Sequence, residues 1–427
     1  MNIKYITLGC KVNQYETEAI REEFNKRGYT DFENLPADIC IINTCSVTSE
    51  SDRKARQTLR RCRKENENAV IILTGCMVQA FPEKSSKLTE ADIIIGNTDT
   101  KKIAETAEDF LKERKRILSV DGHKSGELYN TPSISAFSER TRAYMKIEDG
   151  CDRFCTYCII PYAKGRVRSR NLEEIKNEAR ALSLNGFSEI VLVGINLSSY
   201  GKGESFDLTD AVNAVCSVEN IKRVRLGSLE PDCISDEMLE ALKREEKFCP
   251  QFHLSLQSGC DETLKRMNRH YDSAFYYDLV QRIRKMFADA AITTDIMVGF
   301  AGETEEEFNQ SLSFVNKVGF ARSHIFPYSV REGTPAADYK NQVDGKTKES
   351  RAKLMAKAAL KSEAEFLSNL KGKTFPVLFE NFENGRFEGF TPNYSKVYVK
   401  TSENLHGTIR NVKITAAFDN YCEGELV

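Results

Sequence analysis

The sequence predicts an α/β protein in three parts: an amino-terminal parallel α/β domain, a central partial TIM-like barrel of six βα units and a small carboxy-terminal antiparallel β-barrel. Three observations predict this arrangement. Short apolar runs alternate with helical patterns over residues 1 to about 97, the alternation resumes at about residue 138, and the final stretch holds only short strand-like runs. The 427 residues are too many for one ordinary core. We therefore divide the chain into a first domain over 1–115, a linker over 116–137, a barrel over 138–368 and a last domain over 369–427.

The first domain repeats one unit. Helical stretches over Tyr15 to Arg27 and Arg53 to Lys64 separate apolar runs, which read IKYITL, DICIIN, AVIILT and ADIIIG. Short buried runs separated by helices predict βαβ units with a parallel sheet. Cys10, Cys45 and Cys76 each come directly after one of the first three runs. Because the carboxyl ends of parallel strands share one edge of a sheet, we expect these three cysteines to become neighbours.

A helix over Lys101 to Arg116 and a polar connection lead into the barrel. Strand-like runs there read RAYMKI, EIVLVG, KRVRLGS, QFHLSLQ, ITTDIMVG and SHIFPYS. Helical stretches such as Leu172 to Leu184 and Thr304 to Val318 lie between them. Six βα repeats predict a partial barrel whose chemistry lies at the carboxyl ends of its strands.

The last part begins with a long charged helix over Lys346 to Leu370. Five short alternating runs follow, with glycine and asparagine at the turns: TFPVLFE, GRFEGFTP, KVYVKT, GTIRNVKITAAF and CEGELV. This pattern predicts a small antiparallel barrel.

Composition restricts the class of protein. Hydrophobic residues make up 41% of the chain, charged residues 29%, and the formal net charge is −2. Contact with nucleic acid must therefore come from local basic patches. The start of the chain has no apolar segment behind a basic one and no later run has the length of a membrane span, so we expect a cytoplasmic protein without a membrane partner. The 13 cysteines indicate metal or redox chemistry better than a disulfide framework.

The most informative segment is Cys151, Cys155 and Cys158, with the spacing C-x3-C-x2-C directly after the first barrel strand. Three thiolates this close can hold three irons of a cubane cluster and leave the fourth iron open. An open iron suits a chelating cosubstrate such as S-adenosylmethionine. The alternative is a structural zinc site. Such a site needs four ligands, and no histidine or fourth cysteine lies nearby in the sequence.

Cys10, Cys45 and Cys76 are weaker signals. A single cysteine beside an apolar strand is usually only a small buried hydrophobic residue. Together, at equivalent positions of one sheet edge, they predict a second cluster with an open iron. We assign packing or surface roles to the other seven, which are Cys40, Cys62, Cys216, Cys233, Cys249, Cys260 and Cys422. The five histidines fall singly and receive no role.

A basic helix directly follows Cys45. Its cationic residues are Arg53, Lys54, Arg56, Arg60, Arg61, Arg63 and Lys64. Such a run is often only a solvated face, but this one starts at the proposed reactive edge and so favours RNA. Arg166, Arg168 and Arg170 follow the barrel cysteines and are further candidates for phosphate contacts. In the tail, Phe382, Phe387, Phe390 and Tyr394 fit either base stacking or core packing.

Several motifs resemble the methylthiotransferase family. These are TLGCKVNQYETE at 7–18, NTCSVT at 43–48, GC at 75–76, GCDRFCTYCIIPYAKGRVRSR at 150–170, LQSGCDETLKRMNRHY at 256–271, VGFAGETEEEF at 298–308 and FPYSVREGTPAA at 326–337. The resemblance covers nearly the whole chain. It implies an amino-terminal cluster domain, a radical S-adenosylmethionine barrel and a carboxy-terminal TRAM domain that binds RNA.

Carried over residue by residue, the resemblance implies that Cys151, Cys155 and Cys158 hold the radical-generating cluster. Cys10, Cys45 and Cys76 would hold an auxiliary cluster that presents sulfur. The backbone around Tyr157 would meet the adenine of the cosubstrate. Further residues at successive strand ends would line its pocket, although each also fits ordinary loop structure; they are Gly194, Asn196, Ser228, Glu230, Gln257, Arg269, Gly299, Gly302 and Glu303. No catalytic residue beyond the cluster ligands is implied.

The opening motif looks most like the branch that acts on N6-threonylcarbamoyladenosine at position 37 of tRNA. The implied reaction makes the 2-methylthio derivative with two S-adenosylmethionine molecules and two [4Fe–4S] clusters. The implied partners are the tRNA anticodon stem-loop, S-adenosylmethionine and an electron donor such as flavodoxin or ferredoxin, without DNA. The alternatives are a methylthiotransferase for isopentenyladenosine-37 or for a ribosomal protein, and, in another class, a non-catalytic iron–sulfur electron carrier or a zinc-stabilised RNA-binding protein.

Overall fold

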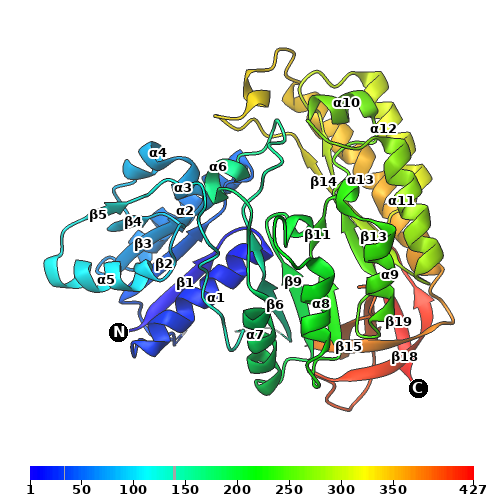
Figure 1. The fold of residues 1–427 in the computed structure, drawn as a ribbon, viewed down its shortest axis with the longest axis horizontal. Helices are drawn as coiled ribbons and strands as arrows, with labels where there is room; N and C mark the ends of the chain where they lie inside the picture. Colours follow the sequence, from blue (N-terminus) through cyan, green and yellow to red (C-terminus); the bar gives the residue numbers. More distant parts are fainter. Residues whose placement is uncertain (33, 138–140) are drawn as a thin grey trace.

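The computed structural model describes residues 1–32, 34–137 and 141–427. The start expected for the barrel at residue 138 lies outside the described residues. Figure 1 shows an amino-terminal lobe on the left, the barrel in the middle and right, and a small β-barrel below it in red. The α/β fold class with a carboxy-terminal β-barrel is therefore confirmed.

The amino-terminal lobe is a five-stranded parallel sheet in the order β1-β2-β3-β4-β5. Its strands are β1 (Ile3–Thr7), β2 (Ile39–Thr44), β3 (Val70–Gly75), β4 (Ile93–Ile95) and β5 (Ile117–Ser119). Its helices are α1 (Lys11–Lys26), α2 (Ser49–Glu65), α3 (Cys76–Ala80), α4 (Pro82–Ser86) and α5 (Lys102–Glu113). Successive residues of β2 face opposite sides, so Ile41 packs with α1 and α5 while Ile42 packs with α2.

Strand β5 was not predicted, because it lies in the segment that the sequence indicates as linker. It has only three residues and none of them is buried, so it lacks the apolar run that marks the other four strands. Its pairing with β4 nevertheless extends the sheet by one strand.

The six strand-like runs of the barrel all form strands, and the third is split in two. One sheet has the order β10-β9-β6 and the other the order β11-β12-β13-β14, all parallel. The strands are β6 (Arg142–Lys146), β9 (Glu189–Val193), β10 (Arg223–Leu226), β11 (Ser228–Leu229), β12 (Gln251–Leu254), β13 (Ala291–Val298) and β14 (Arg322–Pro327). The edge strands β6 and β14 do not pair within the described residues, so the barrel is partial.

Helices cover the outside of the barrel, except for α6 (Ile160–Lys164), which packs on α3 of the amino-terminal lobe. The others are α7 (Leu172–Leu184), α8 (Leu208–Cys216), α9 (Asp236–Arg244), α10 (Asp261–Arg266), α11 (Ser273–Met286), α12 (Glu305–Val318) and α13 (Gly345–Ser368), with short 3₁₀ turns at Leu197–Ser199, Pro231–Cys233 and Pro335–Asp338. Asn171 and Thr304 accept hydrogen bonds from the first turns of α7 and α12. These caps satisfy free backbone N–H groups and fix where each helix begins.

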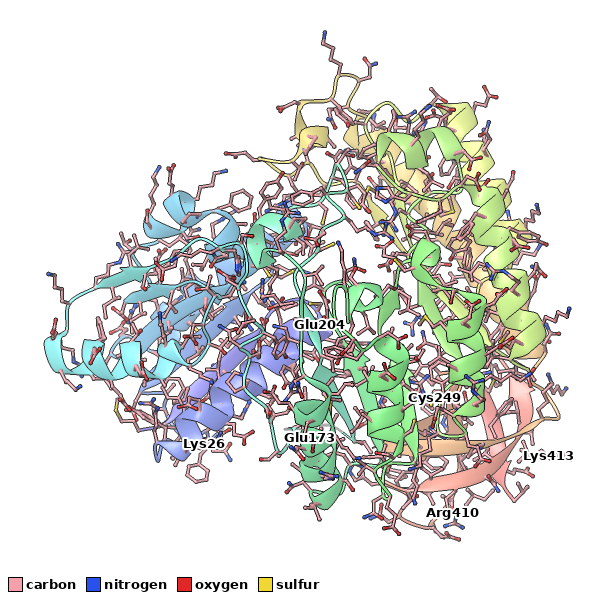
Figure 2. All side chains as sticks on the ribbon, viewed as in Figure 1. Lys26, Glu173, Glu204, Cys249, Arg410 and Lys413 are labelled. Carbon is pink, nitrogen blue, oxygen red and sulfur yellow. The ribbon has the colours of Figure 1, made fainter. Side chains whose placement is uncertain are left out.

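The carboxy-terminal barrel closes in the order β15-β16-β17-β19-β18. Its strands are β15 (Thr374–Glu383), β16 (Arg386–Phe390), β17 (Lys396–Val399), β18 (Ile409–Ala417) and β19 (Cys422–Leu426). Four of the pairings are antiparallel, as predicted, but β17 and β19 run parallel where the barrel closes. Arg410 and Lys413 project from its surface (Figure 2).

This small barrel docks at the amino ends of the large barrel's strands. Buried Glu189, the first residue of β9, accepts hydrogen bonds from Arg225 at 3.1 Å and Arg223 at 3.3 Å. The same arginines donate to the carbonyl oxygens of Pro392 at 2.8 Å and Phe390 at 2.9 Å. The carboxyl ends of the strands, where ligands bind in such barrels, therefore stay clear of it.

Candidate functional site

The first cysteine trio is assembled by the topology of the amino-terminal sheet. Cys10 precedes α1, Cys45 follows β2 and Cys76 opens α3, so all three lie at one sheet edge as predicted. Burial raises the pKa of the Cys76 thiol, and the neighbouring Cys45 and Cys10 raise it further. Gly9 has a φ of +108°, and a Cβ there would lie 2.7 Å from Cys45 Cβ. Glycine is needed because the Cys45 side chain occupies that space.

The second trio is held in one loop. Cys151, Cys155 and Cys158 lie between β7 (Glu148–Asp149) and α6, and β7 pairs with β8 (Arg168–Ser169). The backbone N–H of Cys158 donates to the Cys155 carbonyl at 2.9 Å, which makes a tight turn. Burial raises the pKa of Cys151 and of Cys158 to about 12. Cys155 and Cys151 also raise the pKa of Cys158 electrostatically, so the three thiols are neighbours.

Each trio has the donors that a cubane cluster needs. Among residues 1–32, 34–137 and 141–427, no three His, Cys, Asp or Glu side chains have the geometry to hold one metal ion. A cubane binds each thiolate through a different iron, so three neighbouring thiols match three of its corners. Both trios also have a cation beside them, which suits thiolate ligands. Arg269 Nη1 lies 3.3 Å from Cys155 Sγ, and Lys164 lowers the pKa of Cys76.

A buried set of charges joins the two trios. We call it the junction cluster and define it as Glu16, Lys146, Asp149, Lys164 and Arg168. Glu16 Oε1 on α1 accepts from Lys164 Nζ at 2.6 Å and from Lys146 Nζ at 2.7 Å. Lys146 also donates to Asp149 at 2.7 Å, two residues before Cys151. The junction cluster therefore connects the helix after Cys10 to the loop of the second trio.

The charges of the junction cluster sustain one another. Burial alone would raise the pKa of Glu16, but Lys146 and Lys164 hold it below its usual range. Burial alone would lower the pKa of Lys164, but Glu16 and Asp149 raise it. Lys146, Lys164 and Arg168 likewise hold the pKa of Asp149 below its usual range against the effect of burial, so Glu16, Asp149 and Lys164 are ionised at neutral pH.

Helix packing reinforces this junction. Helix α6, which follows Cys158, packs on α3, which begins at Cys76, and the two lie together in Figure 1. A second contact lies on the other side of the interface, where Arg331 donates to Ser46 and to Asp52, each at 2.8 Å. The two trios therefore face the same interface between the lobe and the barrel.

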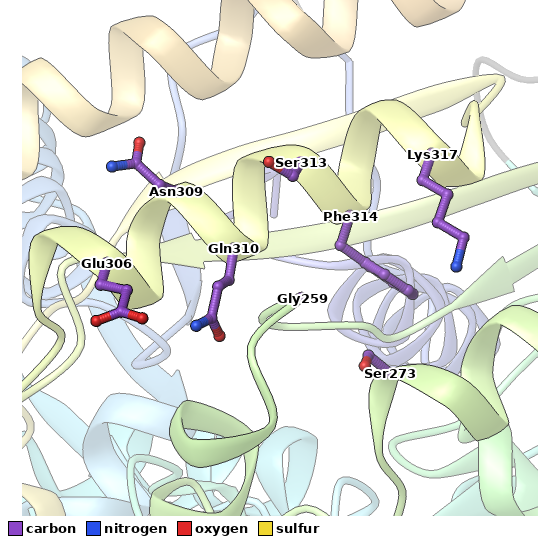
Figure 3. A pocket seen from close by; sticks show the side chains of 8 residues that line it. All are labelled: Gly259, Ser273, Glu306, Asn309, Gln310, Ser313, Phe314 and Lys317. Atoms are coloured by element: carbon purple, nitrogen blue, oxygen red, sulfur yellow. The ribbon is translucent and has the colours of Figure 1, made fainter.

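A cavity of about 150 Å³ lies in this interface. Val47 and Thr48 line it from the amino-terminal lobe, and the barrel contributes Tyr157, Cys158, Ile159, Ile160, Gln257, Asp295, Met297, Phe326, Pro327, Tyr328 and Ser329. A larger hollow of about 520 Å³ lies elsewhere, between α12 and the loop at Gly259. Figure 3 shows Gln310, Phe314 and Lys317 pointing toward it; no cysteine lines it, so it is not part of this site.

The structure brings together only some residues predicted to bind the cosubstrate. Tyr157 and Gln257 line the cavity with Cys158, and Gln257 has a φ of +68° and an unpartnered buried Oε1. Arg269 lies against Cys155 and pairs with Glu230 at 3.2 Å. These four side chains are positioned at the thiols of the second trio.

The other predicted cosubstrate residues are engaged elsewhere. Asn196 donates its backbone N–H to Glu148, and a Cβ at Gly194 would lie 2.5 Å from the same carboxylate. Glu303 accepts from the N–H of Gly299 and from Arg351, both at 2.8 Å, and so ties the turn that includes Gly302 to α13. Ser228 is exposed at β11. None of these residues lines the interface cavity.

The RNA prediction is corrected at two arginines. Arg170 is fully buried and pairs with Glu178 at 2.7 Å, and Arg168 is buried against Asp149 at 3.2 Å. Side chains buried in this way cannot reach a phosphate, so these two predictions are wrong. Arg63 donates to the carbonyls of Glu90 and Ala69 and to Asp92, but its side chain is 28% exposed, so its contact with RNA stays a prediction. The exposed basic residues are Arg53, Lys54, Arg56, Arg60, Arg61, Lys64 and Arg166.

In the carboxy-terminal tail, most of the aromatic residues that were candidates for base stacking pack within the protein instead. Phe387 and Phe390 are buried, and Phe390 stacks on Tyr394 with ring centroids 4.8 Å apart. Arg142 and Arg225 lie against the Tyr394 ring, so this residue belongs to the docking contact. Phe382 is 58% exposed and remains available for stacking.

Sequence reasoning missed the junction cluster and the polar residues of the barrel's inner strands. Glu16 and Lys164 lie in the two cysteine motifs, but a lone charge near a motif gives no sign that it will be buried. His253, Asp295 and His324 carried a usable signal, because each is a titratable residue within a run that was predicted as a barrel strand. Cys249, to which no site role is assigned from the sequence, precedes β12 at the amino end of the strands (Figure 2).

Comparisons with known proteins agree with the geometry. Residues 145–315 match the radical SAM superfamily model, and residues 2–96 match the uncharacterized protein family UPF0004. The threonylcarbamoyladenosine tRNA methylthiotransferase of Bacillus subtilis is 38% identical over 100% of this chain and 96% of its own length. That of Thermotoga maritima is 37% identical over 93% of this chain and 90% of its own. The tRNA-2-methylthio-N6-dimethylallyladenosine synthase of Caldicellulosiruptor saccharolyticus is 36% identical, over 99% and 92%.

Among solved structures, the radical S-adenosylmethionine methyltransferase TsrM of Kitasatospora setae matches with a TM-score of 0.58. The match covers 79% of this chain and 77% of that one at 13% identity, so it supports the fold alone. Within the described residues, no helix is long and apolar enough to cross a membrane.

Proposed function

The chain belongs to the radical S-adenosylmethionine methylthiotransferase family, and from that premise we propose that it converts N6-threonylcarbamoyladenosine at position 37 of tRNA into its 2-methylthio derivative. The observation that carries the proposal is the pair of cysteine trios at one interface, joined by the buried contact of Lys164 with Glu16. Two reactive centres must lie close together when one activates a carbon and the other delivers a group to it. The proposal includes a cytoplasmic location.

Membership of the family implies S-adenosylmethionine and one [4Fe–4S] cluster. We propose that Cys151, Cys155 and Cys158 hold this cluster, and that Cys10, Cys45 and Cys76 hold a second. When bound, these groups would supply the electron that cleaves S-adenosylmethionine and the sulfur that is transferred. Such cofactor chemistry is needed because the C2–H bond of adenine is inert. The reducing electron would come from a donor such as flavodoxin or ferredoxin.

The protein's own residues bind, orient and exclude water. Tyr157 and Gln257 line the interface cavity beside Cys158 and would contact the cosubstrate. The Arg269–Glu230 pair keeps a guanidinium 3.3 Å from Cys155 Sγ. The junction cluster holds the two loops at a fixed separation without admitting water, since Lys146, Lys164 and Glu16 are all buried.

The anticodon stem-loop would lie over α2. This helix begins four residues after Cys45, and its exposed cations include Arg60, which lies 3.3 Å from Glu90, and Arg53, which pairs with Glu50 at 2.7 Å. Arg166 is exposed beside the second trio, with its guanidinium over the Phe154 ring. Basic side chains around both trios would hold the phosphates while the base enters the interface.

Nucleoside mass spectrometry of tRNA from cells that lack the gene tests the proposal. We expect the 2-methylthio derivative of N6-threonylcarbamoyladenosine to disappear, its unthiolated precursor to accumulate, and a plasmid copy to restore the product. Loss of 2-methylthio-dimethylallyladenosine instead would assign the chain to the other nucleoside. An unchanged set of tRNA nucleosides would overturn the proposed function.

A further inference from the structure

The inner strands of the barrel carry a group of polar side chains that the proposed function has not used. We call it the polar stripe and define it as His253 on β12, Asp295 on β13, and Arg322 and His324 on β14. Strand register pairs His253 with Thr293, Thr293 with Arg322, and Asp295 with His324. Because paired residues of adjacent parallel strands point to the same face, the polar stripe lies on one side of the sheet.

That side is the one that faces the thiols. Asp295 lines the interface cavity together with Cys158 and Tyr157. At its other end the polar stripe adjoins a second cavity of about 290 Å³, which Arg322, His324 and Thr293 line together with residues of α13 and the carboxy-terminal barrel. The polar stripe therefore runs from the second cysteine trio toward the cavity between β14, α13 and the carboxy-terminal barrel.

Two members of the polar stripe pair with each other, and the side chains of the other two form no ion pair or hydrogen bond with any residue that the structure describes. His253 Nε2 lies 3.3 Å from Asp295 Oδ2, and its Nδ1 is 3.1 Å from the hydroxyl of Thr293. Burial lowers the pKa of His324. Arg322, His253 and Lys11 lower this pKa further, whereas Asp295 raises it. His324 is therefore a neutral imidazole near pH 7, able to donate one hydrogen bond and accept another.

Arg322 is a cation that the protein leaves open. It is exposed at the start of β14, and no ion pair to its guanidinium forms within the described parts of the chain. Arg322 acts electrostatically on Glu363 of α13. Burial raises the pKa of the Glu363 carboxyl, and Arg322 opposes that rise. The barrel arginines at the opposite edge differ, because Arg142, Arg223 and Arg225 all pair with Glu189. An unpaired arginine beside a cavity is suited to bind a carboxylate.

We infer that the polar stripe recognises the threonylcarbamoyl group of the substrate, with Arg322 binding its carboxylate and His324 and Asp295 hydrogen-bonding its hydroxyl and urea N–H groups. This inference rests on the proposed function. The group to be recognised carries a negative charge and several hydrogen-bonding atoms at the N6 side of the adenine, whereas a dimethylallyl group carries none.

The polar stripe would therefore act as a specificity element. A hydrocarbon substituent in the same place would cover Arg322 and His324 without offering them a partner. Leaving buried polar groups unpaired is what lets a hydrogen-bonding site reject an apolar analogue strongly. An unmodified adenosine would leave the same groups in water and would lose only the contacts themselves.

Binding of matched RNAs to the cluster-loaded protein tests the inference. Two fluorescein-labelled anticodon stem-loops would differ only at position 37, one with adenosine and the other with N6-threonylcarbamoyladenosine, and fluorescence anisotropy would give the ratio of their Kd values. We expect Arg322→Gln to lower the preference for the modified loop about tenfold, which is about 1.4 kcal/mol. His324→Leu should lower it by a smaller factor, and Arg322→Lys should keep part of it. Arg244→Gln, a charge loss on exposed α9, serves as the control and should leave the ratio unchanged.

The outcomes separate the inference from the proposed function. If the wild-type protein thiolates the modified loop but Arg322→Gln and His324→Leu keep its full preference, with normal iron content and Tm, the polar stripe inference is overturned and the function stands. If the wild-type protein neither prefers nor thiolates the modified loop, both fall. A loss of affinity for both loops equally would show a general RNA contact and would also overturn the inference.

Discussion

The two cysteine trios offer the same donors but are built in different ways. Cys151, Cys155 and Cys158 share one loop, and a short β-pair and α6 hold that loop in place. Cys10, Cys45 and Cys76 come from three separate strand ends and meet only because the sheet aligns those ends. We call the trio in one loop the local trio, because it is a feature of that loop, and the trio from three strand ends the distributed trio, because it is a product of the tertiary fold.

The difference predicts unequal sensitivity to change. A local loop can keep its ligands when distant parts of the fold shift. A trio assembled by topology depends on strand register, on the close approach at Gly9 and on the helices that follow each cysteine. The junction cluster links the two designs, since Glu16 belongs to the helix after Cys10 and Lys164 to the helix after Cys158.

The largest expected effect comes from removing one ligand of either trio. Cys155→Ala should reduce both S-adenosylmethionine cleavage and thiolation to background, because the proposed electron source is lost. Cys45→Ala should spare cleavage but stop thiolation, because only the proposed sulfur source is lost. Chromatography of the cleavage products together with nucleoside mass spectrometry would measure the two reactions separately.

Iron and sulfide analysis of the same proteins, reconstituted without oxygen, provides the control. The wild-type chain should hold about eight irons, as two four-iron clusters require, and each variant about half as many. Cys62→Ala, at a buried cysteine outside both trios, should keep the full complement. Normal thiolation by Cys45→Ala would show that the amino-terminal trio holds no functional cluster.

The local trio and the distributed trio also differ in how far the sequence predicts them. The C-x3-C-x2-C spacing is enough to predict the local trio. All six barrel runs form strands where the apolar pattern indicated them. The distributed trio followed from one inference about strand ends, and the structure places those cysteines at one sheet edge. Burial was not predictable: Arg170 and Arg166 look alike in the sequence, but Glu178 and Tyr15 come from elsewhere in the fold to enclose Arg170.

The junction cluster gives the next largest effect. Glu16→Gln keeps the size of the side chain but leaves Lys146 and Lys164 with one buried carboxylate, Asp149, between them. Breaking a buried ion pair in this way costs about 3–5 kcal/mol, so Tm should fall by several degrees. Thiolation should fall more than S-adenosylmethionine cleavage, because the separation of the two loops is disturbed while the second trio keeps its own turn.

A matched change on the surface calibrates this result. Glu349→Gln removes a carboxylate that pairs with Lys353 at 2.7 Å on the exposed face of α13. Exposed pairs contribute roughly 0–1 kcal/mol, so this variant should be nearly as stable and as active as the wild type. Equal losses of cleavage and thiolation in Glu16→Gln would mean that the junction cluster serves stability alone.

A smaller, more local effect is expected from two glycines that share a left-handed backbone. Gly9→Ala places a Cβ 2.7 Å from Cys45 Cβ, whereas Gly28→Ala, at a φ of +82°, meets nothing within 4 Å. Both should cost about 1–2 kcal/mol for the backbone conformation. Only Gly9→Ala should also lose iron, toward half of the wild-type content, as measured by iron analysis and calorimetry. Equal iron contents in the two variants would contradict the close approach between Gly9 and Cys45.

The smallest effect concerns the phosphate contacts beside each trio. Arg56 on α2 is exposed near the distributed trio, and Arg63 on the same helix is tied to Asp92 and to backbone carbonyls. Arg56→Gln should weaken tRNA binding several-fold and lower the slope of log Kd against log salt by about 0.7–0.9, the value for one lost phosphate contact. Arg63→Gln should lower Tm with the salt slope unchanged, because its guanidinium is engaged by Asp92 and by the carbonyls of Glu90 and Ala69. A lower slope for Arg63→Gln, or an unchanged one for Arg56→Gln, would mean that the RNA approaches a face other than the exposed side of α2, and the distributed trio would then have no phosphate contact of its own.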